Sequence, residues 1–268
     1  MGPLHVFARH ETIQHRINEW LSTSHRLVLL LDYDGTLVQI KKTPSLAVLS
    51  KGMRDVLRRI LRHRRISLGL VTGRSISDIK KLVGLKGLFL IANHGLETWL
   101  DSKSWVHPGA KRFLPVLDNL FRSLKKRLIS VRGVFIEHKQ YSLTVHFRNV
   151  PAKHVPFVRR RVMEAFAPYS RILRTTVGKK VLEIRPGFSW GKGHAISRVL
   201  QLMRLRRKPA IIYIGDDTTD EDAFQLLNKD AATVRVGWNR HTKAKYFVRN
   251  IAEVKRLLEA IVVLYTEG

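Results

Sequence analysis

The sequence contains no cysteine, and no apolar run in it approaches the roughly 20 residues that a membrane-spanning helix needs. Without thiols the chain can form neither a disulfide framework nor a thiolate zinc site. The amino-terminal segment MGPLHVFARHETIQHRINEW lacks the apolar core of a signal peptide, and its apolar residues fit one face of a helix. We therefore expect a soluble, cytoplasmic protein with no membrane partner. We also expect a monomer.

Acidic residues are scarce, since 21 Asp and Glu stand against 49 Lys and Arg and give a formal net charge of +28. Such a surplus favours anionic partners, either a small phosphorylated substrate or nucleic acid. The basic residues are spread through helical stretches instead of forming a tail, and the sequence has no zinc finger and no aromatic RNA-binding signature. We expect a phosphorylated small molecule to be the partner, and not nucleic acid.

Short apolar runs alternate with amphipathic helical stretches over much of the chain. The strand-like runs lie within segments 25–36, 66–75, 87–95, 209–217 and 232–237, and the helical stretches include 51–65, 75–85 and 220–229. This alternation predicts an α/β fold with a Rossmann-like parallel sheet covered by helices on both faces. In such sheets the chemistry gathers beyond the carboxyl ends of the strands. The polar residues at those ends are Asp32, Thr72, Asn93 and Asp216.

The stretch from about Lys111 to Arg185 follows a different pattern, in which a helix precedes two paired strands, twice over. The expected helices are 114–128 and 155–169, and the expected strand pairs are 131–137 with 141–150 and 171–177 with 180–186. The pattern predicts an α+β cap inserted at residues 110–186 into a core domain of residues 1–109 and 187–268. Such an insertion can close over a site at the edge of the sheet.

Four segments carry residues suited to phosphoryl chemistry. DYDGT sets Asp32 and Asp34 two residues apart, where two carboxylates repel unless a cation or a proton lies between them. VTGRS offers the hydroxyl of Thr72 and the backbone amide of Gly73, and SWGKGHAI places Lys192 at a helix start, where phosphoryl oxygens are favoured. YIGDDTTDED has five acids and no Cys or His, a set of hard oxygen ligands suited to Mg²⁺.

Each segment alone is compatible with an ordinary turn or helix cap, but their order and their places at strand ends favour a catalytic site. Together the four segments resemble the motifs of haloacid dehalogenase superfamily phosphatases. More narrowly, DYDGTL, VTGRS, NHGLE, SWGKGHAI and GDDTTDEDAF are similar to the motifs of trehalose-6-phosphate phosphatases, over residues 27 to about 253. The resemblance implies a haloacid dehalogenase core with an inserted cap. It also implies hydrolysis of trehalose 6-phosphate, the final step of trehalose synthesis.

The resemblance further implies a role for each core residue. Asp32 would be the nucleophile that forms an aspartyl-phosphate, and Asp34 the general acid and then the general base. Thr72, Gly73 and Lys192 would hold the phosphoryl oxygens. The implied Mg²⁺ site consists of Asp32, the backbone carbonyl of Asp34 and Asp216, with Asp217 and Asp220 steadying the metal's waters.

The resemblance assigns sugar recognition to the cap. Glu137, Lys139 and Glu183 match the family's residues that contact sugar hydroxyls, and Ser142 and Lys179 are further candidates, for which ordinary surface roles are an alternative. On the core side the candidates for contact with the substrate are Arg74, Asn93, His94 and Gly95. His94 either contacts the substrate or makes a hydrogen bond within its loop, and Arg74 either contacts the substrate or pairs with a nearby acid.

Two other functions stay open on the sequence alone. A phosphatase for sucrose 6-phosphate or a glycosyl-phosphoglycerate would share the core motifs, because these motifs handle the phosphoryl group and not the sugar. A nucleic-acid-binding module on a retired phosphatase fold would explain the basic charge. The complete set of catalytic residues argues against the retired fold, since such a module needs neither Asp32 nor Asp34.

Overall fold

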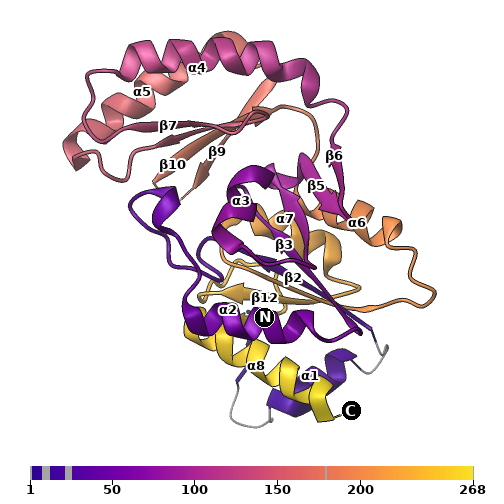
Figure 1. The fold of residues 1–268 in the computed structure, drawn as a ribbon. Coiled ribbons are helices and arrows are strands. Elements are labelled where there is room, and N and C mark those ends of the chain that lie inside the picture. Colours follow the sequence, from indigo (N-terminus) through magenta and orange to yellow (C-terminus); the bar gives the residue numbers. More distant parts are fainter. Residues whose placement is uncertain (1, 8–12, 22–25, 179, 268) are drawn as a thin grey trace. The chain divides into compact units, whose positions relative to one another are not determined.

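The chain divides into two compact units in a computed structural model that describes residues 2–7, 13–21, 26–178 and 180–267. One unit comprises Met1–Trp105 and Trp190–Gly268, and the other comprises Val106–Ser189. Each unit has its own cluster of buried apolar side chains. The second unit is therefore an insertion in the sequence of the first (Figure 1).

The described residues of the first unit form a nine-stranded sheet in the order β1-β13-β12-β11-β2-β3-β4-β5-β6. Its strands are β1 (Leu4–His5), β2 (Leu27–Asp32), β3 (Ile66–Val71), β4 (Phe89–Ala92), β5 (Glu97–Leu100), β6 (Lys103–Val106), β11 (Ala210–Gly215), β12 (Ala232–Val236) and β13 (Tyr246–Val248). Neighbouring strands from β1 to β4 in this order are parallel, whereas β5 is antiparallel to β4. This arrangement confirms the predicted α/β fold with a parallel sheet.

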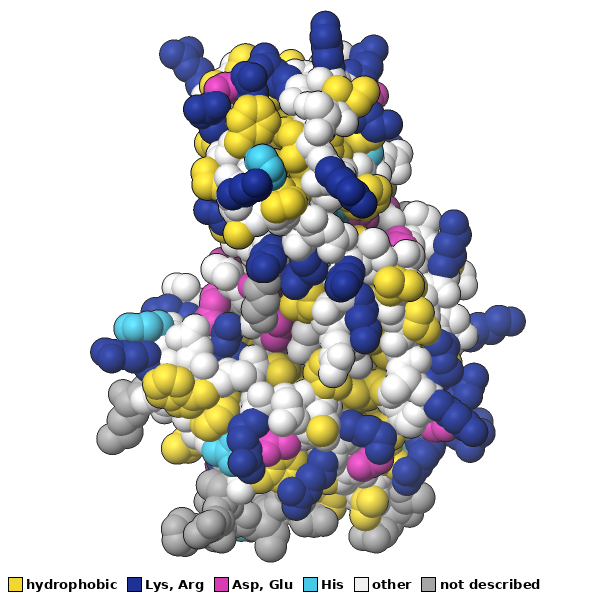
Figure 2. Space-filling view, turned by 90° about the vertical axis from the view of Figure 1, so that its left-hand side faces the viewer, with side chains coloured by type: hydrophobic (Ala, Val, Ile, Leu, Met, Phe, Trp, Pro, Cys, Tyr) yellow, Lys and Arg dark blue, Asp and Glu magenta, His cyan; other side chains and the backbone are white. Residues whose placement is uncertain are grey.

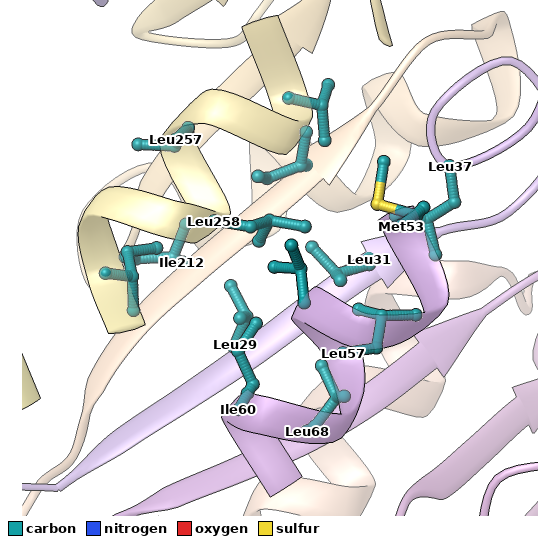
Figure 3. Packing of buried hydrophobic residues seen from close by; sticks show 14 of the residues in the cluster. Leu29, Leu31, Leu37, Met53, Leu57, Ile60, Leu68, Ile212, Leu257 and Leu258 are labelled. Carbon is teal, nitrogen blue, oxygen red and sulfur yellow. The ribbon is translucent and has the colours of Figure 1, made fainter. Parts of the chain in front are cut away.

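Strand β2 lies between β11 and β3 and is buried along its whole length. Its continuous apolar run suits this place, because a strand inside a parallel sheet is covered on both faces. Figure 3 shows Leu29 and Leu31 pointing toward Leu57 and Leu258 from two helices on one face of the sheet. The alternate residues of β2 pack in the cluster on the other face. The position of the strand's last residue, Asp32, is thus set by packing on both sides.

Helices cover both faces of this sheet. The helices that contribute to one cluster are α1 (Ile13–Leu21), α2 (Lys51–Leu61), α3 (Ile76–Val83) and α8 (Ile251–Glu267), and those that contribute to the other are α6 (Lys192–Leu202) and α7 (Thr218–Leu227). The hydroxyl of Ser50 caps α2 and that of Ser75 caps α3. Helix α2 ends at Leu61, short of the expected residue 65, where the sequence turns uniformly basic before β3.

The second unit is a four-stranded antiparallel sheet in the order β7-β8-β10-β9, with two helices packed on one face (Figure 1). Its elements are α4 (Leu114–Leu128), β7 (Phe135–His138), β8 (Leu143–His146), α5 (Val155–Phe166), β9 (Leu173–Gly178) and β10 (Val181–Pro186). Leu143, Val145, Leu182 and Ile184 pack on the helices. The intervening residues of these strands, Thr144 and Glu183 among them, therefore lie on the opposite, polar face.

Short 3₁₀ turns connect several of these elements. They are Pro44–Leu46, Asn93–Gly95, Lys111–Phe113, Ala152–His154 and Ala167–Tyr169.

Lys and Arg side chains are dispersed over the face shown in Figure 2, and Asp and Glu are sparse on it. The surplus of positive charge is therefore distributed over this face and does not form a single patch. None of the helices in the described ranges combines the length and the apolar character needed to cross a membrane.

We expect Leu57→Ala to lower the free energy of unfolding by about 3 kcal/mol, because the substitution leaves a cavity in a close-packed core. Leu57 is fully buried, whereas Leu202 is 47% exposed and serves as the matched control. Urea denaturation followed by circular dichroism measures both variants. A loss of stability in Leu202→Ala equal to that in Leu57→Ala would contradict the assignment of Leu57 to the core.

Candidate active site

Three carboxylates converge at the carboxyl ends of β2 and β11. Asp32 ends β2, and Asp216 directly follows β11, which pairs with β2 in parallel. Asp220 comes from the first turn of α7. One oxygen from each of the three lies within 4.8 Å of the others, and all three residues are buried. Parallel register thus brings together acids that lie almost 190 residues apart in the sequence.

Lys192, the first residue of α6, lies against this cluster. Its Nζ donates to Oδ1 of Asp32 and to Oδ1 of Asp220, both at 2.7 Å. The hydroxyl of Tyr213 on β11 also donates to Asp220. When all groups are ionised, three carboxylates and one ammonium leave this buried site with a formal charge of −2. A hard divalent cation fits both that charge and the all-oxygen donor set.

The surroundings shift the pKa of each of these groups. Burial raises the pKa of Asp32 well above its usual value, despite the opposing effect of Lys192. Burial alone would lower the pKa of Lys192, but Asp220 and Asp32 outweigh it and raise that pKa. Asp220 is buried as well, yet Lys192 and its hydrogen bonds bring its pKa below the usual value. Asp32 is therefore the carboxylate for which an added cation would do most to favour ionisation.

Two glycines give the carboxylates room. A Cβ on Gly35, whose φ is +92°, would lie 2.2 Å from Oδ2 of Asp216. A Cβ on Gly215 would lie 2.4 Å from Cγ of Asp220. Both distances are far below van der Waals contact, so a side chain at either position would displace a carboxylate. The glycines of DYDGT and of the acidic segment are thus required by the shape of the site.

Asp34 is bound by Arg74, whereas Asp32 is bound by Lys192. Nε and Nη2 of Arg74 donate to its two oxygens at 2.7 and 2.8 Å, which makes a bidentate pair. The same buried guanidinium donates to Oδ2 of Asp78 at 2.6 Å and to the carbonyl of Pro44 at 2.9 Å. Arg74 was expected either to contact the substrate or to pair with a nearby acid. These contacts show that it pairs with acids.

The loop residues Thr72, Gly73, Asn93 and His94 are linked to one another. The backbone N–H of His94 donates to the carbonyl of Thr72, and a Cβ on Gly73 would lie 2.3 Å from Nε2 of His94. Asn93 and His94 both have positive φ, 50° and 55°, which is unusual for residues other than glycine and typical of functional loops. The 93–95 turn is therefore held close to the backbone of the VTGRS segment, with the carbonyl of Gly95 accepting from Trp190 Nε1.

On the polar face of the second unit's sheet, three of the expected sugar-binding residues form a network. Nζ of Lys139 lies 3.3 Å from Oε1 of Glu183 and 4.0 Å from Oε2 of Glu137. The carbonyl of Ser142 accepts from the backbone N–H of Lys139 and closes the turn between β7 and β8. Lys179 lies outside the described residues.

The structure adds partners that the sequence reasoning missed. Thr144 donates to Glu183, and Nε2 of His146 lies 2.9 Å from Oε2 of Glu137. The two-residue alternation along β8 was the available signal, because it places Thr144 and His146 on the same face of the strand. Tyr213 on β11 had a comparable signal, because the same alternation places it on one face of the strand with Gly215. Asp217 precedes α7 and lies outside the cluster of three carboxylates.

Known proteins are similar to this chain in sequence and in fold. The model of the trehalose-phosphatase family matches residues 30–252. Trehalose 6-phosphate phosphatase RA3 of Zea mays is 33% identical over 254 residues, which cover 88% of this chain and 70% of that protein. A solved trehalose-6-phosphate phosphatase related protein is 30% identical, with a TM-score of 0.77 over 90% of this chain and 99% of its own. The C-terminal domain of trehalose-6-phosphate phosphatase from C. albicans shares the fold, with a TM-score of 0.80, 23% identity and coverage of 98% and 99%.

We expect Arg74→Lys to lower the free energy of unfolding by about 2 kcal/mol, because an ammonium cannot reproduce the bidentate pair with Asp34 while also reaching Asp78. Arg58→Lys is the control, since Arg58 pairs with Asp55 at the surface and both side chains are about half exposed. Its expected change is below about 0.5 kcal/mol. Urea denaturation of the two variants makes the comparison, and equal stabilities would contradict the role given to Arg74.

Proposed function

The chain belongs to the trehalose-phosphatase family, and on that basis we propose that it hydrolyses trehalose 6-phosphate to trehalose and inorganic phosphate. The observation that carries the proposal is the buried contact of Asp32 with Lys192 beside Asp216 and Asp220. Phosphoryl transfer needs a nucleophile, cations around the phosphoryl oxygens and a proton donor for the leaving group. The residues around Asp32 supply each of these.

Asp32 is the proposed nucleophile. Its carboxylate attacks phosphorus, the bond between phosphorus and the sugar oxygen breaks, and an aspartyl-phosphate forms. Water then attacks the same phosphorus, which releases inorganic phosphate and restores Asp32. Lys192, within hydrogen-bond reach of Asp32, would stabilise the charge that builds on the phosphoryl oxygens, together with the hydroxyl of Thr72 and the amide of Gly73.

Asp34 is the proposed proton carrier. It gives a proton to the leaving sugar oxygen in the first step and takes one from the attacking water in the second. Both of its oxygens accept from Arg74, so proton donation requires one of these hydrogen bonds to be exchanged for one to the leaving oxygen. The remaining bond to Arg74 keeps the carboxyl group oriented during that exchange.

The proposed metal is Mg²⁺, held by Asp32, Asp216 and the backbone carbonyl of Asp34, with Asp217 and Asp220 supporting its waters. The three buried carboxylates and the formal charge of −2 support a divalent cation at this place. When bound, the cation supplies positive charge next to the phosphoryl group and favours the ionised form of Asp32.

The second unit, Val106–Ser189, is the proposed specificity cap, and the predicted insertion of residues 110–186 lies within it. Glu137, Lys139 and Glu183 would bind sugar hydroxyls. The hydroxyl groups of a sugar can hydrogen-bond to these charged side chains, so the side chains keep polar partners when the ligand covers them. Ser142 is a further candidate in the cap, as is Lys179.

On the core side, the proposed contacts with the substrate come from the 93–95 turn of Asn93, His94 and Gly95. Its positive φ angles and its contacts with the VTGRS backbone support a role in shaping the site. Arg74 acts in this proposal through Asp34, and not through contact with the substrate.

Phosphate release from a panel of sugar phosphates tests this function. We expect turnover of trehalose 6-phosphate at least about tenfold faster than that of sucrose 6-phosphate or a glycosyl-phosphoglycerate, since the cap must fit the sugar. Asp32→Asn should lower turnover by at least about 10³-fold, because an amide cannot form the acyl-phosphate. Asp55→Asn, on α2 and with its side chain about half exposed, is the control and should turn over normally. Equal or better activity on another sugar phosphate would contradict the substrate assignment, and unchanged activity in Asp32→Asn would contradict the mechanism.

Removal of divalent cations with a chelator should abolish turnover, and Mg²⁺ should restore it. Mg²⁺ should also raise the melting temperature of the wild-type protein, since binding to the folded state stabilises it. We expect this shift to shrink markedly in Asp216→Asn, which loses one carboxylate of the cluster, and to persist in Asp101→Asn at an exposed turn. Differential scanning fluorimetry measures both shifts. An identical shift in Asp216→Asn would rule out this metal site.

A further inference from the structure

Arg185 on β10 is a buried arginine without an acidic partner in the described part of the chain. It is 8% exposed, and its one hydrogen bond there is from Nη2 to the hydroxyl of Thr176, at 3.3 Å. Its Nε is buried and makes no hydrogen bond with the described residues. Arg185 lies two residues after Glu183, so both side chains are on the polar face of the second unit's sheet.

This arrangement is unfavourable unless an anion completes it. A guanidinium carries five N–H donors and a permanent charge, and arginines are rarely buried without a counter-charge. A single neutral hydroxyl does not offset the loss of hydration. The residue directly opposite on β9 is a second arginine, Arg174, so the neighbouring strand offers Arg185 no acid at this position.

The acids on the same face already have other partners. Glu183 accepts from Lys139 and Thr144, and Glu137 lies in hydrogen-bond contact with His146. The polar face thus has a part rich in carboxylates and a part with two arginines, separated along β10 by roughly 7 Å, the length of two residues in a strand. Carboxylates suit sugar hydroxyls, and arginines suit an oxyanion.

We propose that Arg185 is the centre of an anion-binding site on the polar face of this sheet and that its ligand is a phosphate oxyanion. The planar fork of a guanidinium matches two oxygens of a phosphoryl group. Two sources carry this group, the 6-phosphate of the substrate and free inorganic phosphate, and the first rests on the proposed function. Binding of the substrate's phosphate would let the cap distinguish the charged substrate from neutral trehalose and so favour release of the product.

Arg185→Gln tests the site in the full-length protein, with Arg171→Gln as its control. Arg171 is exposed in the same unit, so its substitution removes the same charge without touching the site. We expect Arg185→Gln to raise the KM for trehalose 6-phosphate about tenfold or more, because hydrogen bonds between charged groups are strong, with kcat within about twofold. Inhibition by trehalose should be unchanged. Arg185→Lys should restore part of the lost affinity, and Arg171→Gln should behave as the wild type.

The shift in melting temperature caused by inorganic phosphate separates the two sources. If Arg185→Gln loses part of this shift and its KM is unchanged, the ligand is free phosphate. If it loses part of the shift and its KM also rises, the ligand is the phosphate of the substrate. The proposal is overturned if neither quantity differs from the wild type, or if inhibition by trehalose weakens as much as the KM rises, which would indicate a distorted sheet. Should Arg185→Gln fail to fold, the same comparison is made with Arg185→Lys.

A failure of the proposed function gives a different result. In that case the wild-type protein does not release phosphate from trehalose 6-phosphate, and no variant has a measurable KM. The melting temperatures of wild type, Arg185→Gln and Arg171→Gln with and without inorganic phosphate still decide whether Arg185 binds an anion.

Discussion

The ammonium of Lys192 between the carboxylates of Asp32 and Asp220 is the interaction on which the site depends. It joins the end of β2 to the starts of α6 and α7, three elements that the parallel sheet brings together. Without it, three buried carboxylates would repel one another at short range. With it, the cluster keeps a formal charge that suits a divalent cation, and the carboxylate of Asp32 is held by a hydrogen bond from Lys192.

The two acids of DYDGT have different cationic partners. Asp32 contacts Lys192, whereas Asp34 contacts Arg74, so their mutual repulsion is relieved by separate partners. The two environments also differ in exposure, since the side chain of Asp32 is almost fully buried and that of Asp34 is about one-third exposed. In the proposed mechanism a divalent cation beside Asp32 would favour its ionised, nucleophilic form, and the more exposed Asp34 would exchange protons.

The second unit also holds charged side chains close together, on an antiparallel sheet. Its antiparallel sheet buries apolar side chains under two helices and leaves charged residues on the other face, where Lys139 pairs with Glu183 and His146 with Glu137. The dispersed Lys and Arg of the surface complement these local sites, because a positive surface attracts a phosphorylated sugar from a distance (Figure 2). Recognition at short range then belongs to specific groups such as Arg185.

The sequence by itself determined the parallel sheet, the inserted helix–strand unit and the family, because apolar periodicity and short motifs are local properties of the chain. Tertiary structure decided which charges meet: Arg74 with Asp34, Tyr213 with Asp220, and His146 with Glu137. It also decided that Arg185 is buried without an acid among the described residues. These pairings follow from strand register and burial, which arise when distant segments pack. A local pattern such as the alternation along β8 can place a residue on one face of a strand, but it cannot specify which group that residue meets.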